Sequence, residues 1–155
     1  MTRCDLNLGF IGLGAIGLPM AANLCRSGFR LNAHTRSRSA ETAPELQGAR
    51  SCASPAEAAD AVDVLLICVS DDQAVETVLF GSDGAASTLR PDSVVVDCST
   101  IAPATAMACA KRLAQRGINY LDAPVTGGTE GAKAGTLTRS VGGEPTARAG
   151  VPPAR

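Results

Sequence analysis

Aromatic residues are scarce in this chain of 155 residues: they make up 3% of it, and tryptophan is absent. The core must therefore be built from Ala, Val, Leu and Ile, and the 45% hydrophobic content is typical of a globular protein. The longest apolar run, Val64 to Val69, is far shorter than the roughly 20 residues of a membrane-spanning helix. The chain length suits one domain, so we expect a single globular domain with no membrane partner.

An excess of either charge is also missing. The sequence has 14 basic and 15 acidic residues, with a net charge of −1 at pH 7. Such a balance provides no basic surface for nucleic acid, so we expect no nucleic-acid partner. Arg3 and Asp5 lead directly into the first apolar segment, which argues against a signal peptide and predicts a cytoplasmic location.

Histidine occurs once, as His34, and no pair of cysteines has the C-x-x-C spacing of metal or redox sites. We interpret the cysteines as reduced, small core residues, and we expect no metal. A disulfide or metal role is the less favoured alternative. The six cysteines are Cys4, Cys25, Cys52, Cys68, Cys98 and Cys109.

Three glycines are present where a nucleotide would need them. Gly12, Gly14 and Gly17 lie between an apolar segment, Leu8–Ile11, and a helical pattern over Ala15–Ser27. This is the G-x-G-x-x-G pattern of a dinucleotide-binding loop, in its required context of strand, turn and helix. The first glycine permits a tight turn, the second lets the backbone approach a pyrophosphate, and the third lets the helix pack on the strand. The alternative is a glycine-rich connection without a ligand.

Apolar runs alternate with helical patterns along the chain, which predicts an α/β fold: a Rossmann-like, doubly wound, mostly parallel sheet. We expect strands at Leu8–Ile11, Arg30–His34, Val64–Cys68, Val94–Asp97, Asn119–Leu121 and Leu137–Val141. We expect helices at Ala15–Ser27, Pro55–Asp60, Asp72–Phe80 and Pro103–Arg116. The predicted nucleotide-binding domain comprises residues 1–143. Residues 144–155 lack apolar periodicity and are predicted to form an irregular tail.

The second expected strand lacks the acid that bonds the ribose 2′-hydroxyl in NAD-binding folds. About 20 residues beyond the glycines the sequence reads His34-Thr35-Arg36-Ser37-Arg38. Arginine binds phosphate through a planar fork, so Arg36 and Arg38, with Thr35 and Ser37, are suited to a 2′-phosphate. The sequence favours NADP, with NAD possible; the alternative is a pair of solvated surface arginines.

Three motifs, in this order, resemble the β-hydroxyacid dehydrogenase family, which includes 3-hydroxyisobutyrate dehydrogenase and tartronate semialdehyde and glyoxylate reductases. The first is the glycine-rich segment from Gly9 to Leu24, GFIGLGAIGLPMAANL. The second is DCSTIAP, from Asp97 to Pro103. The third is DAPVTGG, from Asp122 to Gly128, which continues to Leu137. The resemblance extends to about residue 143.

The resemblance implies roles for the matching positions. The pyrophosphate would be held by Gly12, Leu13, Gly14, Ala15, Ile16 and Gly17. The adenosine ribose would lie against Val69, Ser70 and Asp71, and the nicotinamide near Ser99 and Thr100. A small carboxylate substrate would be held by Thr126, Gly127 and Gly128, since exposed amides after a strand form anion-binding concavities. For this last segment, a tight turn is the alternative.

In this family a lysine beyond the nucleotide domain acts as general acid/base during hydride transfer. Lys111 and Lys133 match neither its position nor its context, so the chain is expected to contain no catalytic residue. The all-helical C-terminal domain, through which the family oligomerises, is likewise expected to be absent. We interpret the chain as a truncated NADP-linked 3-hydroxyacid dehydrogenase. The alternatives are a relative of 6-phosphogluconate dehydrogenase and a non-enzymatic NADP-binding module.

Overall fold

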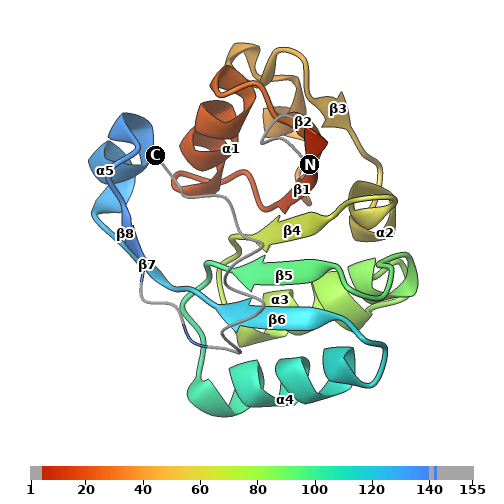
Figure 1. Cartoon of the computed structure of the whole chain (residues 1–155). Coiled ribbons are helices and arrows are strands. Elements are labelled where there is room, and N and C mark those ends of the chain that lie inside the picture. Colours follow the sequence, from red (N-terminus) through yellow and green to blue (C-terminus); the bar gives the residue numbers. More distant parts are fainter. Residues whose placement is uncertain (1–4, 140–141, 143–155) are drawn as a thin grey trace.

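The computed structural model describes residues 5–139 and 142, and its centre is a six-stranded parallel sheet (Figure 1). The strand order is β3-β2-β1-β4-β5-β6, so the direction of winding reverses between β1 and β4. This order confirms the predicted doubly wound sheet. The strands are β1 (Asn7–Ile11), β2 (Arg30–His34), β3 (Arg50–Ser51), β4 (Val64–Ile67), β5 (Val94–Asp97) and β6 (Asn119–Asp122).

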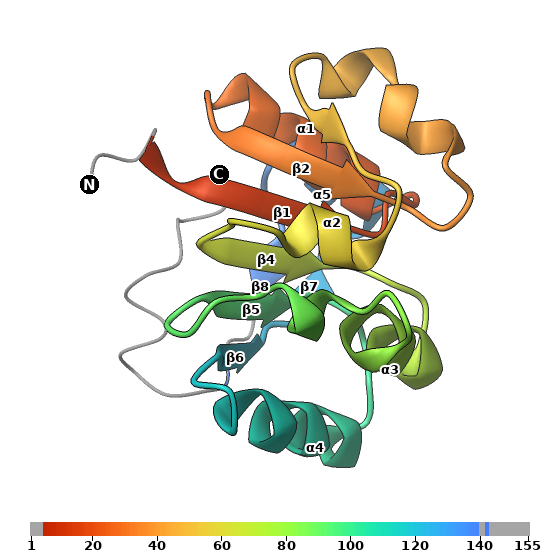
Figure 2. The ribbon, with the colours of Figure 1, turned by 90° about the vertical axis from the view of Figure 1, so that its right-hand side faces the viewer.

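Helices cover both faces of the sheet (Figure 2). The side chains of α1 and α5 pack on one face, and those of α2, α3 and α4 pack on the other. The helices are α1 (Gly17–Arg26), α2 (Pro55–Ala59), α3 (Asp72–Phe80), α4 (Pro103–Ala114) and α5 (Gly128–Ala134). Single 3-10 turns occur at Ser39–Thr42, Pro44–Leu46 and Ala85–Ser87.

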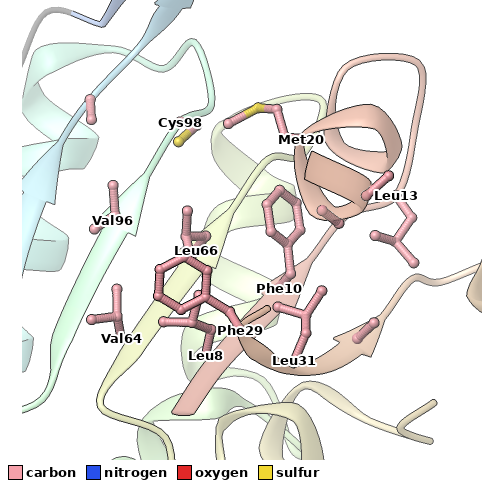
Figure 3. Close-up of a cluster of buried hydrophobic side chains, with 14 of the residues drawn as sticks. Leu8, Phe10, Leu13, Met20, Phe29, Leu31, Val64, Leu66, Val96 and Cys98 are labelled. Atoms are coloured by element: carbon pink, nitrogen blue, oxygen red, sulfur yellow. The ribbon is translucent and has the colours of Figure 1, made fainter. Parts of the chain in front are cut away.

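The core follows from the alternation of side chains along the parallel strands. Phe10 and Leu66 point toward α1, where they meet Met20 (Figure 3). Ile11 and Leu65 point the other way, into the cluster beneath α2, α3 and α4. Strands buried on both faces read as continuous apolar runs, which is why β4 and β5 were recognisable in the sequence.

The start of α2 shows how closely a local signal can fix an element. The hydroxyl of Ser54 accepts a hydrogen bond from the Glu57 amide at 3.1 Å, and Pro55 occupies the first helical position. The Glu57 carboxylate in turn accepts from the Ala53 amide at 2.7 Å. These bonds satisfy amides that the helix leaves unpaired.

The C-terminal part of the described chain contains two elements that were not predicted, β7 (Val125–Thr126) and α5. The strand predicted near Leu137–Val141 is present at Thr138–Arg139 as β8, which pairs antiparallel with β7 in a separate two-stranded sheet. The helix α5 was not predicted, because glycine-rich Gly128–Ala134 has weak intrinsic helix propensity. It packs against α1, and the Asn23 side-chain amide donates to the Ala132 carbonyl at 2.8 Å. Ser140, Val141 and the predicted tail at 144–155 lie outside the described residues.

No helix within residues 5–139 is long and apolar enough to cross a membrane. In the same part of the chain, the His, Cys, Asp and Glu side chains form no group of three or more that is suited to a metal ion. The described cysteines, Cys25, Cys52, Cys68, Cys98 and Cys109, are thiols outside any disulfide.

Candidate cofactor-binding site

A cavity of about 660 Å³ opens at the carboxyl ends of β1, β2 and β4. Strand order reverses here, which is where open α/β sheets bind ligands, and the volume suits a small molecule or cofactor. The end of β1, the loop after it and the start of α1 contribute Ile11, Gly12, Leu13, Gly14, Ala15, Ile16 and Gly17. The ends of β2 and β4 contribute His34, Thr35, Arg36, Ser37, Cys68, Val69, Ser70 and Asp71. Helix α3 contributes Gln73, Ala74, Thr77 and Val78.

Each glycine of the loop has a distinct reason to be glycine. Gly12 has φ of +98°, and a Cβ there would lie 2.0 Å from the Cys68 carbonyl oxygen. A Cβ on Gly17 would lie 1.8 Å from the Gly12 carbonyl oxygen, so α1 packs directly on the turn. Gly14 is exposed, and a Cβ there would meet nothing within 4 Å. The missing side chain of Gly14 therefore leaves space for a ligand, not for the protein itself.

Helix α1 directs its N-terminus at the cavity. Its first hydrogen bond runs from the Leu18 amide to the Gly14 carbonyl at 3.0 Å. The amides of the turn before Leu18 therefore have no carbonyl partner within the helix. Unpaired amides and the positive end of the helix dipole favour an anion at this position. The glycine loop therefore has the geometry and the charge that a pyrophosphate requires.

The end of β2 supplies a cation and two hydroxyls. Thr35, Arg36 and Ser37 line the cavity; Arg36 and Ser37 are exposed, and the Thr35 hydroxyl accepts from the Leu13 amide at 3.3 Å. His34 is buried, with its Nδ1 2.9 Å from the Cys52 carbonyl oxygen. Arg38 does not line the cavity and has φ of +64°. Of the two arginines considered for a phosphate, the structure thus places Arg36 at the cavity.

The end of β4 supplies the cavity's acid, Asp71, which is engaged by the protein. Its carboxylate caps α3 by accepting from the Ala74 amide at 2.8 Å and also accepts from the Ser70 hydroxyl at 3.2 Å. The cavity-lining residues of α3 were missed by the sequence analysis. Their spacing at 73, 74, 77 and 78 marks one helix face directly after a predicted binding loop, and that signal could have identified them.

Ser99 and Thr100 are not among the residues that line the cavity. Thr100 is exposed, whereas Ser99 is 2% exposed and its hydroxyl accepts from the Val69 amide at 3.0 Å. The Ser99 amide donates to Asp97, a buried carboxylate that also accepts from the Tyr120 hydroxyl at 2.8 Å. Burial raises the pKa of Asp97, and the hydrogen bonds from Ser99 and Tyr120 act in the opposite direction. Asp97 and Tyr120 were missed, although an acid that ends an all-valine strand is itself a signal.

The expected substrate residues also lie outside the cavity lining. Thr126, Gly127 and Gly128 are exposed between β7 and α5, where the Thr126 hydroxyl is 3.5 Å from the Thr138 carbonyl oxygen. Lys111 and Lys133 are exposed on α4 and α5, and neither lines the cavity. Twelve of the residues proposed from the sequence for the cofactor are therefore gathered in one cavity, and the other site residues are separate from it.

Comparison with known proteins agrees with this geometry. The family described as the NAD binding domain of 6-phosphogluconate dehydrogenase matches residues 7–154. The chain is 41% identical to 2-(hydroxymethyl)glutarate dehydrogenase of Eubacterium barkeri, covering 89% of this chain and 46% of the relative. It is also 41% identical to 2-hydroxy-3-oxopropionate reductase of Escherichia coli, covering 90% of this chain and 47% of the relative. The chain thus spans about half the length of the curated relatives it matches.

Solved structures give the same assignment. Mycobacterium tuberculosis 3-hydroxyisobutyrate dehydrogenase with L-serine matches with a TM-score of 0.86 and 30% identity, over 93% of this chain and 48% of that one. Psf3 in complex with NADP+ and 2-OPP matches with a TM-score of 0.86 and 37% identity, over 92% of this chain and 50% of that one. The chain belongs to the family described as the NAD binding domain of 6-phosphogluconate dehydrogenase, a nicotinamide-cofactor-binding domain.

Proposed function

We propose that the chain binds NADP(H) in the cavity at the ends of β1, β2 and β4, in preference to NAD(H). One observation carries the preference: the end of β2 presents Thr35, Arg36 and Ser37 to the cavity and no carboxylate. An arginine fork suits a 2′-phosphate, whereas an acid at this strand end would suit the 2′-hydroxyl of NAD. The acid that does line the cavity, Asp71, comes from the end of β4 and caps α3.

The other residues expected to contact the cofactor follow its length. The glycine loop and the N-terminus of α1 fit the pyrophosphate, since Gly14 leaves open space there. Val69, Ser70 and Asp71 are proposed to hold the adenosine ribose, and Thr100 is proposed to lie on the nicotinamide side. Bound NADP(H) would supply the hydride exchanged with a small hydroxyacid or semialdehyde. The carboxylate of that substrate is proposed to contact Thr126, Gly127 and Gly128.

Titration of the 155-residue chain with NADPH and NADH tests the cofactor preference. We expect Arg36→Ala to weaken NADPH binding roughly 10- to 100-fold, because hydrogen bonds to charged groups contribute about 1.5–3 kcal/mol. NADH binding should change little. Arg38→Ala is the matched control, since this arginine lies two residues away and does not line the cavity. Equal loss for both cofactors in Arg36→Ala would refute the role of Arg36 with the 2′-phosphate.

A non-enzymatic NADP-binding module is a second candidate, favoured by one observation: neither lysine of the chain lines the cavity. An assay with 3-hydroxyisobutyrate, tartronate semialdehyde, glyoxylate and 6-phosphogluconate separates the possibilities. We expect cofactor binding without turnover of any of the four, because neither lysine of the chain lies at the cavity to act as the general acid/base. Turnover of 6-phosphogluconate by this chain would support the phosphosugar alternative. Turnover of a hydroxyacid would show that a group other than Lys111 and Lys133 handles the proton.

A further inference from the structure

We propose that Ser99 is a positioning residue: its hydroxyl holds the backbone of Val69, and through Val69 the glycine loop, in the geometry that binds the cofactor. The proposal rests on the proposed function in taking NADPH as the ligand. It assigns Ser99 an indirect role, in which the serine acts from beneath the cavity and makes no contact with the ligand.

The pairing of β4 with β5 ends beside the cavity. The backbone ladder between β5 and β4 reaches its last bond at Cys98, whose amide donates to the Ile67 carbonyl at 2.7 Å. The next amide, that of Val69, donates instead to the Ser99 hydroxyl at 3.0 Å. A side chain from the β5 end therefore continues the connection between β4 and β5 one residue beyond the sheet. It does so at the first residue of the Val69–Asp71 cavity loop.

Ser99 is held in place by hydrogen bonds to buried residues of the core. Its amide donates to Asp97 Oδ1 at 2.9 Å, and Asp97 Oδ2 accepts from the Tyr120 hydroxyl at 2.8 Å. Asp97 is 0% exposed, Ser99 2% and Tyr120 8%. Buried networks whose members are all satisfied are rigid, because each alternative arrangement would leave a polar group unpaired. The position of the Ser99 hydroxyl is thus fixed from β6 through β5.

Val69 also lies against the glycine loop. A Cβ placed on Gly12 would lie 2.0 Å from the Cys68 carbonyl oxygen and 3.0 Å from Val69 Cγ1. The backbone of Cys68 and the side chain of Val69 therefore lie directly against the turn at Gly12. Because Cys68 and Val69 are already in close contact with Gly12, a displacement of Val69 also displaces the loop residues that face the pyrophosphate. Ser99 itself does not line the cavity, so its effect on a ligand passes through Val69.

The test compares two serines at opposite ends of β5. Ser99→Ala removes the hydroxyl that holds Val69. Ser93→Ala is the matched control: Ser93 is 5% exposed, and its hydroxyl donates to the Arg90 carbonyl at 2.6 Å just before the strand begins. Tyr120→Phe is a second variant, which keeps the ring and removes the support of Asp97. The readouts are the NADPH dissociation constant, hydrogen exchange at the Val69 amide, and the unfolding midpoint.

We expect Ser99→Ala to raise the NADPH dissociation constant about tenfold and to accelerate exchange at Val69, since a buried amide loses its acceptor. Tyr120→Phe should raise the constant less, by about threefold, because the hydroxyl it removes is one step further away. Ser93→Ala should leave the NADPH dissociation constant and the exchange at Val69 unchanged, even if it lowers the unfolding midpoint as much as Ser99→Ala does.

Unchanged NADPH affinity in Ser99→Ala, or an equal loss in Ser93→Ala, would overturn the positioning role. So would unchanged exchange at Val69. A wild-type chain that binds no NADPH would instead refute the proposed function, and the exchange of Val69 would still show whether Ser99 holds that amide.

Discussion

Replacing each of two loop glycines by alanine should separate stability from cofactor binding. Gly17→Ala places a methyl group 1.8 Å from the Gly12 carbonyl oxygen, in a region where the nearest atoms are backbone. Ordinary contact begins at 3.4 Å, so α1 must move away from the turn by more than 1 Å. Gly14→Ala places the same group in open space, with no atom within 4 Å.

The expected magnitudes differ in sign. Overpacking of a tight site costs about 1–3 kcal/mol or more, which exceeds the gain of about 1 kcal/mol from replacing a helical glycine by alanine. Gly17→Ala is therefore expected to lower the free energy of unfolding by about 2 kcal/mol. Gly14 does not have a positive φ, so alanine there should be neutral or should stabilise the chain by up to about 1 kcal/mol.

Urea unfolding combined with NADPH titration measures both effects on the same samples. Gly14→Ala should unfold at or above the wild-type midpoint and yet bind NADPH at least about tenfold more weakly, because its methyl group occupies the space of the ligand. Gly17→Ala should lose both stability and binding. Wild-type NADPH affinity in Gly14→Ala would refute the assignment of this open space to the cofactor. A wild-type midpoint in Gly17→Ala would refute the packing argument.

Three further outcomes follow from the structure. Burial raises the pKa of Cys68 and of Cys109 to about 11, so iodoacetamide should modify both slowly at pH 8, and NADPH should slow Cys68 further because it lines the cavity. Hydrogen bonds from the Thr105 hydroxyl and from the Ala102 amide hold the pKa of Asp72 below its usual value. The ionised carboxylate therefore stabilises the fold above about pH 4, and this stabilisation is lost as the pH falls. The stability difference between wild type and Asp72→Asn, measured by urea unfolding, should therefore shrink toward acidic pH; a difference that grows would contradict this sign. Ser54→Ala removes the cap of α2 and should cost about 1 kcal/mol in the same assay.

The parallel sheet and its loops were predictable because their signals are local. A run such as Val64–Ile67 is apolar throughout, which is typical of a strand buried on both faces. The glycine loop and the capped start of α2 depend on residues within a few positions of one another. The cavity-lining segments follow from these elements, since the carboxyl ends of β1, β2 and β4 must meet at one edge of the sheet.

The remaining features depend on contacts between distant segments. Three of the seven residues of helix α5, Gly128, Thr129 and Gly131, have low helix propensity, and its order comes from packing on α1 more than 100 residues earlier. The bridge from Tyr120 through Asp97 to Ser99 joins two strands whose register is known only from the fold. A sequence motif marks Ser99 as part of the site without revealing which way its hydroxyl points. Propensity and spacing contain no information on that direction.

Polar side chains at the strand ends have two different roles at the cavity: some hydrogen-bond to the loops, and others remain exposed to a ligand. The hydroxyls of Thr35 and Ser99 accept hydrogen bonds from the amides of Leu13 and Val69, so they are used to hold loops in place. The side chain of Arg36 is exposed at the same edge and lines the cavity, so it remains available to a ligand. Substitution of the internal Ser99 hydroxyl should therefore weaken NADPH and NADH binding alike, because both cofactors share the pyrophosphate that the loops position. Only substitutions at the exposed rim should change the ratio of the two affinities, and that ratio is the quantity that distinguishes a positioning residue from a specificity residue.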